Sequence, residues 1–150
     1  MIPEFNRHGL LPPGIWECSK EQIAARFCWN PLRSTLFKNL NTFLSTEWRQ
    51  TNIECPILIN GSFVRNIPSP SDIDTILDMS HTESTKTLAL AIAVRLRHDT
   101  IKSDLRVDVW VNYPRCSDDF IKIFQQIGMK AAAELRLSST YPKGILRILP

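Results

Sequence analysis

The sequence has no long hydrophobic run. No stretch approaches the roughly 18 consecutive apolar residues that a membrane-spanning helix needs, although 43% of the 150 residues are hydrophobic. Residues 1–7 also lack the basic region followed by an apolar core that marks a signal peptide. We therefore expect a soluble, cytoplasmic protein that has no contact with a membrane.

Cysteine and histidine are too few and too scattered to predict a zinc site. The four cysteines contain no CxxC pair and stand at Cys18, Cys28, Cys55 and Cys116. Without secretory signals, we expect reduced thiols in or near the core. The spacing of the three histidines suggests no ligand set, and we assign no role to His8, His81 and His98.

Repeats, low-complexity tracts and linkers are absent as well. The formal net charge of +3 suits an RNA or nucleotide partner, but it is common in proteins that bind neither. A chain of 150 residues has the length of one domain, and we expect a single domain over residues 1–150. Residues 1–18 are expected to form an extended arm, because prolines and glycines interrupt the apolar residues there.

Helical and strand patterns both occur, so the sequence predicts an α/β or α+β fold with a small mixed β-sheet flanked by helices. N-cap residues and apolar periodicity predict helices at residues 19–27, 30–49, 82–97 and 117–135. The caps are Ser19, Asn30, Thr82 or its neighbours, and Ser117. Short apolar or alternating runs predict strands at residues 55–60, 72–77, 105–112 and 144–149.

Three aspartates combine with two of these strands. In a strand at 72–77, Asp72 and Asp74 point to the same face, and Ile73 points into the core. Asp108 lies on the face of its strand that carries no valine. If the strands are neighbours, the carboxylates gather on one surface, where they raise one another's pKa unless divalent magnesium neutralises them.

A glycine and a serine follow the strand at 55–60. Gly61-Ser62 offers a side-chain-free approach, backbone N–H donors and a hydroxyl, which are what a polyphosphate requires. Two metal ions held by carboxylates would activate an attacking hydroxyl and stabilise a leaving pyrophosphate. The combination indicates nucleotidyl transfer.

These residues resemble the polymerase-beta-like nucleotidyltransferase superfamily, in which a GS turn precedes a DxD pair and a third carboxylate lies on a later strand. Within it, the minimal stand-alone, antitoxin-type members are the most similar. Two segments carry that similarity, GSFVR at 61–65 and SDID at 71–74. The ends of the chain also resemble a small, poorly characterised bacterial branch, through IPEF at 2–5, LPPG at 11–14 and PKGILRI at 142–148.

The resemblance implies a polymerase-beta-like nucleotidyltransferase core and roles for single residues. Gly61, Ser62 and Arg65 would bind the nucleotide. Asp72, Asp74 and Asp108 would be catalytic and would hold the metal, with two Mg²⁺ ions, or Mn²⁺, as cofactor. Phe63-Val64 departs from the small residues that are frequent after the serine, and the helical domain of larger relatives is missing.

The implied activity is transfer of a nucleoside monophosphate from an NTP, ATP among them, to a hydroxyl of a macromolecular acceptor. That acceptor is a toxin-like partner protein or a tRNA, because similar minimal enzymes occur in toxin–antitoxin and phage-defence gene pairs. The alternative is a catalytically inactive antitoxin or immunity-type binding protein with the same fold. The nucleotide, the acceptor and the oligomeric state stay open.

Two further features each allow two interpretations. Trp110 shares a face with Asp108, and it either stacks on a base or packs under the adjacent helix. A basic region is either a solvated face or a contact surface for a polyanion such as tRNA, and it consists of Arg95, Arg97, Lys102 and Arg106.

Overall fold

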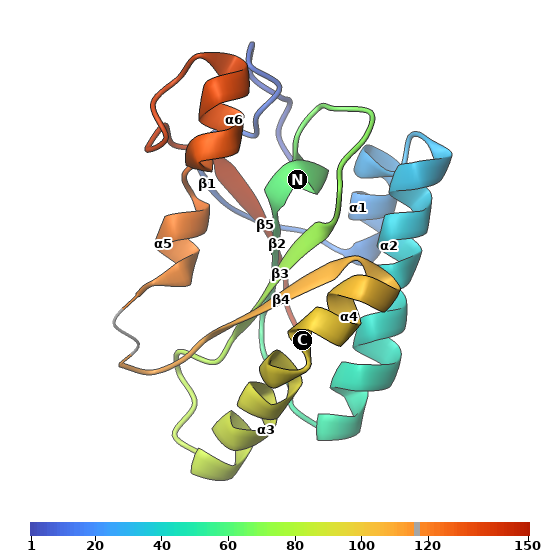
Figure 1. Cartoon of the computed structure of the whole chain (residues 1–150), viewed down its shortest axis with the longest axis vertical. Coiled ribbons are helices and arrows are strands. Elements are labelled where there is room, and N and C mark those ends of the chain that lie inside the picture. Colours follow the sequence, from blue (N-terminus) through green and yellow to red (C-terminus); the bar gives the residue numbers. More distant parts are fainter. Residues whose placement is uncertain (116–117) are drawn as a thin grey trace.

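The computed structural model describes residues 1–115 and 118–150, which form a five-stranded mixed β-sheet flanked by helices (Figure 1). The strands are β1 (Gly14–Glu17), β2 (Ile57–Asn60), β3 (Ile73–Asp78), β4 (Val107–Asn112) and β5 (Gly144–Ile148). Their order in the sheet is β1-β5-β2-β3-β4. β1 is parallel to β5 and β3 is parallel to β4, whereas β2 is antiparallel to both neighbours. The predicted mixed α/β fold is confirmed.

Helices cover the two faces of the sheet unequally (Figure 1). The described α-helices are α1 (Lys20–Phe27), α2 (Pro31–Phe43), α3 (Thr85–Leu96), α4 (His98–Leu105), α5 (Phe120–Phe124) and α6 (Gly128–Leu135). The first four pack on one face, where the main hydrophobic core lies. A smaller apolar cluster beneath α5 covers only part of the other face. Within the described residues, no helix has the length and apolarity needed to cross a bilayer.

The first two helices begin where their caps predict. Ser19 and Gln22 form a reciprocal capping box at the start of α1, and the Asn30 side chain accepts a hydrogen bond from the Arg33 N–H. Beyond Phe43 the helical path continues as a π-helical turn and a 3-10 turn to Thr51. The helical path therefore ends close to residue 49, as predicted, but the part after Phe43 is not α-helical.

The region after β3 agrees with the prediction in part. Ser84, a neighbour of Thr82, caps α3 through the Thr87 N–H, and the helix ends at Leu96, close to the predicted end at residue 97. A second helix, α4, follows at once and is not predicted. Its eight residues include only two large apolar ones, Ile101 and Leu105, and Leu105 is predicted as the start of the strand at 105–112, which in the structure begins at Val107.

The single helix predicted over 117–135 is wrong, because two helices occupy this region. Gly128 has a φ of +72°, and the Ile127 and Gly128 N–H groups donate to the carbonyls of Tyr141 and Ser139. Hydrogen bonds to a distant segment thus replace those of a continuous helix. The start of α5 is capped by Asp119.

Two predictions concern residues that lie outside the described part of the chain, namely the reduced thiol of Cys116 and the helix cap at Ser117. The other cysteines are free thiols, as expected, namely Cys18, Cys28 and Cys55. The arm at residues 1–18 contains a hydrogen-bonded turn between Asn6 and Leu10, and it is extended only in part, ending in β1, which pairs with β5.

Arg33 is a fully buried cation under the turn that follows β2. Its guanidinium donates to the carbonyl of Phe27 at 2.5 Å, to that of Ile67 at 2.7 Å, and to that of Phe63. It also lies 4.8 Å from the centre of the Phe63 ring. Burial lowers the pKa of Arg33 to about 10. One side chain therefore connects α1, α2 and the turn at 61–64.

We expect Arg33→Met to destabilise the protein by roughly 3 kcal/mol or more, because each buried carbonyl left without a donor costs about 1–3 kcal/mol. Urea unfolding measures the change. The matched control is Arg97→Met, which removes an exposed ion pair with Glu47 and should cost less than about 1 kcal/mol. Equal stability of the two variants would show that the Arg33 contacts do not hold the turn.

Candidate functional site

Polar residues form a row across one end of the sheet, on the face opposite the main core. Asn60 in β2 is opposite Asp74 in β3, and Asp74 is opposite Asp108 in β4. Lys143, directly before β5, donates a hydrogen bond from Nζ to Asn60 Oδ1. Asp72 lies one residue before β3, not inside a strand as predicted. The three aspartates nevertheless come together beside the end of β2.

Gly61 allows this row to form. It begins the 3-10 turn η3 (Gly61–Val64) with a φ of +78°. A Cβ at this position would lie 1.8 Å from Asp74 Oδ2, so any side chain at residue 61 would displace the carboxylate. Ser62 Oγ accepts a hydrogen bond of 3.3 Å from the Ser71 N–H. The turn and the start of β3 therefore hold each other in place.

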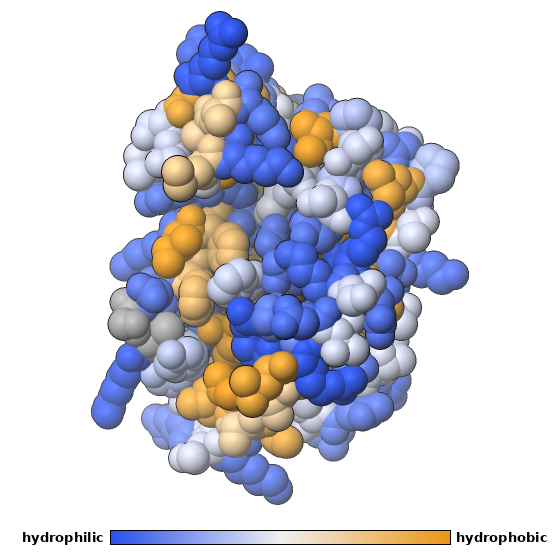
Figure 2. All heavy atoms as spheres, viewed as in Figure 1, coloured by the Kyte–Doolittle hydropathy of each residue, from blue (hydrophilic) through white to orange (hydrophobic). Residues whose placement is uncertain are grey.

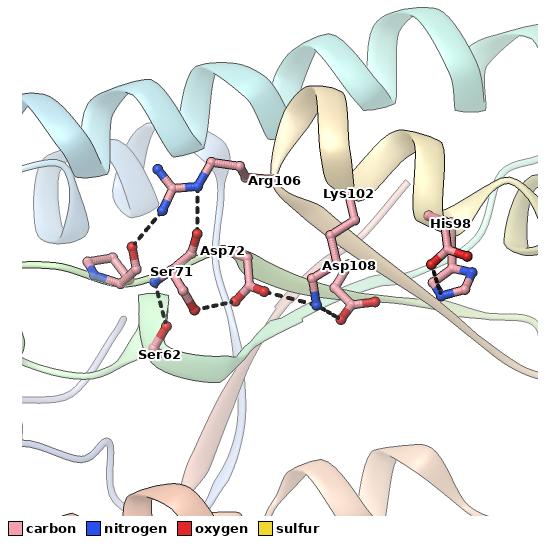
Figure 3. Close-up of polar contacts among 9 residues, drawn as sticks. Ser62, Ser71, Asp72, His98, Lys102, Arg106 and Asp108 are labelled. Atoms are coloured by element: carbon pink, nitrogen blue, oxygen red, sulfur yellow. Dashed lines mark hydrogen bonds and ion pairs between the residues drawn. The ribbon is translucent and has the colours of Figure 1, made fainter.

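Lys102 bridges two of the carboxylates. It extends from α4 so that Nζ lies 2.5 Å from Asp108 Oδ2 and 3.1 Å from Asp72 Oδ2 (Figure 3). The hydrogen bond to Asp108 is the main reason that the pKa of Lys102 is raised. The ammonium thus neutralises part of the negative charge where the sequence predicts a metal ion.

The pKa of Asp74 is strongly raised. Burial, followed by the charges of Asp72 and Asp108, raises its pKa from 3.8 to about 6. Lys143 and Lys102 act in the opposite direction but do not compensate. Asp74 therefore carries an electrostatic strain that a bound cation would relieve.

The loop before Asp72 is fixed by a basic residue. Arg106 donates through Nε to the Ser71 carbonyl at 2.6 Å and through Nη2 to the Pro70 carbonyl at 3.3 Å (Figure 3). Ser71 in turn donates from Oγ to Asp72 Oδ1 at 3.0 Å. Arg106 thus positions Asp72 without touching it.

A pocket of about 390 Å³ opens beside the turn at Gly61. Its polar side includes Ser62, Asp72 and Asp74, and its apolar side is formed by α5, α6 and the residues between them. Figure 2 shows the same contrast, with apolar residues along the α5 and α6 side of the molecule and hydrophilic residues beside them. Asp108 is not among the lining residues.

Arg65 also lines the pocket. It is buried, with Nη2 2.9 Å from Glu134 Oε2 in α6. The structure thus brings together Gly61, Ser62, Arg65, Asp72 and Asp74 around one pocket and sets Asp108 next to it.

One of the two open alternatives has a structural answer. Trp110 packs under α5, with ring centres 5.4 Å from Phe120 and 5.5 Å from Phe124. The basic residues each have a partner within the chain, but Arg97 and Lys102 are exposed, so both interpretations of the basic region stay predictions. Arg95 lies 4.7 Å from the centre of the Trp110 ring, and Arg97 pairs with Glu47.

The fit of a metal ion depends on Lys102. As the side chains stand, no group of three or more His, Cys, Asp or Glu residues in the described part of the chain is arranged to hold a metal. Asp108 Oδ1, however, is buried and has no hydrogen-bond partner among these residues. The aspartate oxygens are donors of the kind that Mg²⁺ prefers. The residues fit a divalent cation if Lys102 moves aside.

The sequence analysis gives no site role to three residues of this region, Asn60, Lys102 and Lys143. Lys102 is recognised only as part of a basic region, and Lys143 only as part of the terminal segment PKGILRI. Asn60 ends the apolar strand directly before the GS turn, and this position is the signal that could have identified it.

Comparison with known proteins adds little about chemistry. A family model described as a family of unknown function (DUF6932) matches residues 3–149. No curated protein and no solved structure matches the chain. The interpretation of the site therefore depends on its geometry.

We expect Asp74→Asn to stabilise the metal-free protein at pH 7. Between pH 4 and 6 the native state holds a proton on Asp74 that the unfolded chain has lost, so stability falls as pH rises through this range. A tenfold change in an acid's dissociation constant equals about 1.4 kcal/mol, so the gain is roughly 3 kcal/mol at most.

Urea unfolding at pH 4, 5, 6 and 7 in EDTA measures this difference. Asp104→Asn on the exposed side of α4 is the control, because it changes net charge equally. Parallel pH profiles for the wild type and Asp74→Asn would contradict the electrostatic strain at Asp74.

Proposed function

The chain belongs to the family of unknown function DUF6932, whose description names no activity, and we propose that it is a metal-dependent nucleotidyltransferase. It would transfer a nucleoside monophosphate from an NTP to a hydroxyl of a macromolecular acceptor. The acceptor we propose is a toxin-like partner protein or a tRNA, in a toxin–antitoxin or phage-defence setting. These details come from the resemblance to the polymerase-beta-like superfamily, and so does the assignment of its core fold.

One observation carries the proposal. Asp74 and Asp108 are paired in register on adjacent parallel strands, and Asp74 packs against the glycine of the GS turn. Asp72, two residues before Asp74, lines the same pocket as Asp74 and Ser62. A turn suited to phosphate and a carboxylate cluster suited to a divalent cation are thus adjacent, and nucleotidyl transfer needs both.

The proposed roles of the residues follow from their positions. The backbone N–H groups of the turn at Gly61 and the Ser62 hydroxyl would contact the phosphates, and Asp72, Asp74 and Asp108 would hold the metal. Asp108 would complete the metal site where the attacking hydroxyl is activated. When bound, divalent cations lower the pKa of the acceptor hydroxyl and stabilise the leaving pyrophosphate.

The apolar side of the pocket supports a nucleotide as ligand. Ile123, Phe124, Ile127 and Ala131 line it opposite the polar turn. Pockets of this kind, apolar with a few convergent polar groups, suit ligands that have both flat apolar and charged parts. A nucleotide has a base of the first kind and phosphates of the second.

Lys102 favours a second candidate, an inactive binding protein of the antitoxin or immunity type. Its ammonium already pairs with Asp72 and Asp108. If this pairing is permanent, the carboxylates are neutralised without a metal and the fold serves only to occlude a partner. The two candidates therefore differ in whether the wild-type protein binds divalent cations.

We expect magnesium-dependent binding of at least one of ATP, GTP, CTP and UTP, measured by calorimetry. The double variant Asp72→Asn/Asp74→Asn should weaken it by about tenfold or more, because the carboxylates hold the cation between protein and phosphates. The matched control is Asp99→Asn/Asp104→Asn, which removes two exposed carboxylates from α4.

The same proteins are then incubated with NTPs labelled at the α-phosphate and with tRNA or cell extract. Transfer of label to a macromolecule by the wild type and the control, but not by the double variant, is the expected result. Magnesium-dependent binding without transfer would favour the inactive binding protein. Absence of any magnesium-dependent nucleotide binding would remove the basis of the enzyme proposal.

We also expect Lys102→Met to bind Mg²⁺ or Mn²⁺ about tenfold more tightly than the wild type, since the competing ammonium is gone. Without metal, the variant should melt at a lower temperature, because the aspartates then repel one another. Calorimetry and thermal unfolding in EDTA measure the two effects. Lys86→Met on α3, exposed and distant from the aspartates, is the control. Unchanged or weaker metal binding would show that Lys102 does not compete with the cation.

A further inference from the structure

The carboxylates do not explain the whole pocket. Asp72 and Asp74 line it, and so do three cations, Arg65, Lys130 and Lys143, whose part of the pocket is called the cationic end. Glu134 is the only other acidic residue among the described lining residues. It is paired with Arg65, and no ion pair is described for Lys130 or Lys143, although the charge of Asp74 acts on Lys143.

Lys143 is the least expected of these cations. Its side chain is almost wholly buried, with 5% of the residue exposed. An ammonium has three N–H donors, and the hydrogen bond that it makes goes to the neutral amide oxygen of Asn60 rather than to a carboxylate. Burial lowers the pKa of Lys143 to about 8, against the opposing effect of the nearby Asp74 charge. Burying a charge without an ion pair is costly, and an anionic ligand in contact with Lys143 would supply that pair.

The two ends of the chain together hold Lys143 in this position. The Gly144 N–H donates to the Leu11 carbonyl at 2.9 Å. A Cβ at residue 144 would lie 2.3 Å from the Pro12 carbonyl oxygen, so the chain passes closely under the N-terminal arm. The Lys143 N–H donates to the Gln125 carbonyl at 2.8 Å. The terminal segments LPPG and PKGILRI thus meet where Lys143 enters the pocket.

Arg65 and Lys130 surround the same end. Arg65 is 8% exposed, and its Nε has no hydrogen-bond partner among the described residues. The side chain of its partner Glu134 is 46% exposed, so this ion pair can open toward a ligand. Lys130 is exposed on α6 at the rim of the pocket. The cationic end therefore has both a buried and an accessible ammonium.

We propose that Lys143 is the central residue of a phosphate-binding subsite, together with Lys130 and Arg65, that binds a polyphosphate group without a metal ion. The subsite deepens the proposed function, since it would take the phosphates that extend away from the carboxylates. A phosphate oxygen within reach of Lys143 forms charge-assisted hydrogen bonds, which are stronger than the bond to the Asn60 amide.

The test is calorimetry with inorganic triphosphate in EDTA at constant ionic strength. We expect the wild type to bind and Lys143→Met to bind about tenfold more weakly or worse. The control Lys38→Met removes the same charge from an exposed position on α2 and should bind like the wild type. Methionine replaces the buried ammonium by an apolar chain of similar length but leaves Asn60 Oδ1 without its donor, which is destabilising, so urea unfolding verifies that the variant is folded.

Lys130→Met is a second variant, and because Lys130 is exposed its replacement does not threaten folding. We expect a loss of a few-fold. Equal binding by the wild type and Lys143→Met would overturn the proposal, and so would no binding of triphosphate by the wild type.

The subsite and the enzyme proposal can fail separately. Triphosphate binding in EDTA that depends on Lys143, without any magnesium-dependent NTP binding, would leave the subsite standing and remove the nucleotidyltransferase. Magnesium-dependent NTP binding that is lost in Asp72→Asn/Asp74→Asn but unchanged in Lys143→Met would support the nucleotidyltransferase and remove the subsite.

Discussion

The packing of the Asp74 carboxylate against the α carbon of Gly61 is the contact on which the geometry of the site depends. A Cβ at residue 61 would lie 1.8 Å from Asp74 Oδ2, so only glycine leaves room for both. The positive φ of Gly61 turns the chain directly from β2 into η3. Arg33 holds this turn from the core side through the carbonyl of Phe63. A ligand that binds the turn therefore meets Asp74 as well.

The charges of this region are costly, and their cost is itself informative. Asp74 is buried beside two other carboxylates, and Lys143 is buried against a neutral amide. Apolar residues of similar volume at such positions are often neutral or stabilising, so stability alone does not account for the charges. Lys102 relieves the repulsion at one end of the row through Asp72 and Asp108. Lys143 has no comparable ion pair, which makes the opposite end the better candidate for an anionic ligand.

The sequence predicts four of the five described strands and the face on which Asp74 and Asp108 lie, because a period of two assigns each residue to one face of the sheet. The valine alternation in β4 correctly sets Asp108 on the face opposite the core. The pairing of β1 with β5, the helix α4 and the contacts of Lys102 depend on residues far apart in the chain. Local patterns carry no information about such contacts, so a lysine on a short helix with few apolar residues, such as Lys102 in α4, cannot be distinguished from a solvated one.

The error over the helix at 117–135 and the failure to predict the position of Lys143 in the pocket have the same physical cause. A continuous helix needs the N–H groups near Gly128 to bond to carbonyls four residues earlier. Instead they donate to the segment at 139–141, and the Gln125 carbonyl accepts from the Lys143 N–H. These bonds break the helix, hold α6 beside the pocket and anchor the residue that enters it. The hydrogen bonds between residues 125–128 and 139–143, which periodicity cannot predict, therefore also position the cationic end of the pocket, where Glu134 of α6 pairs with Arg65.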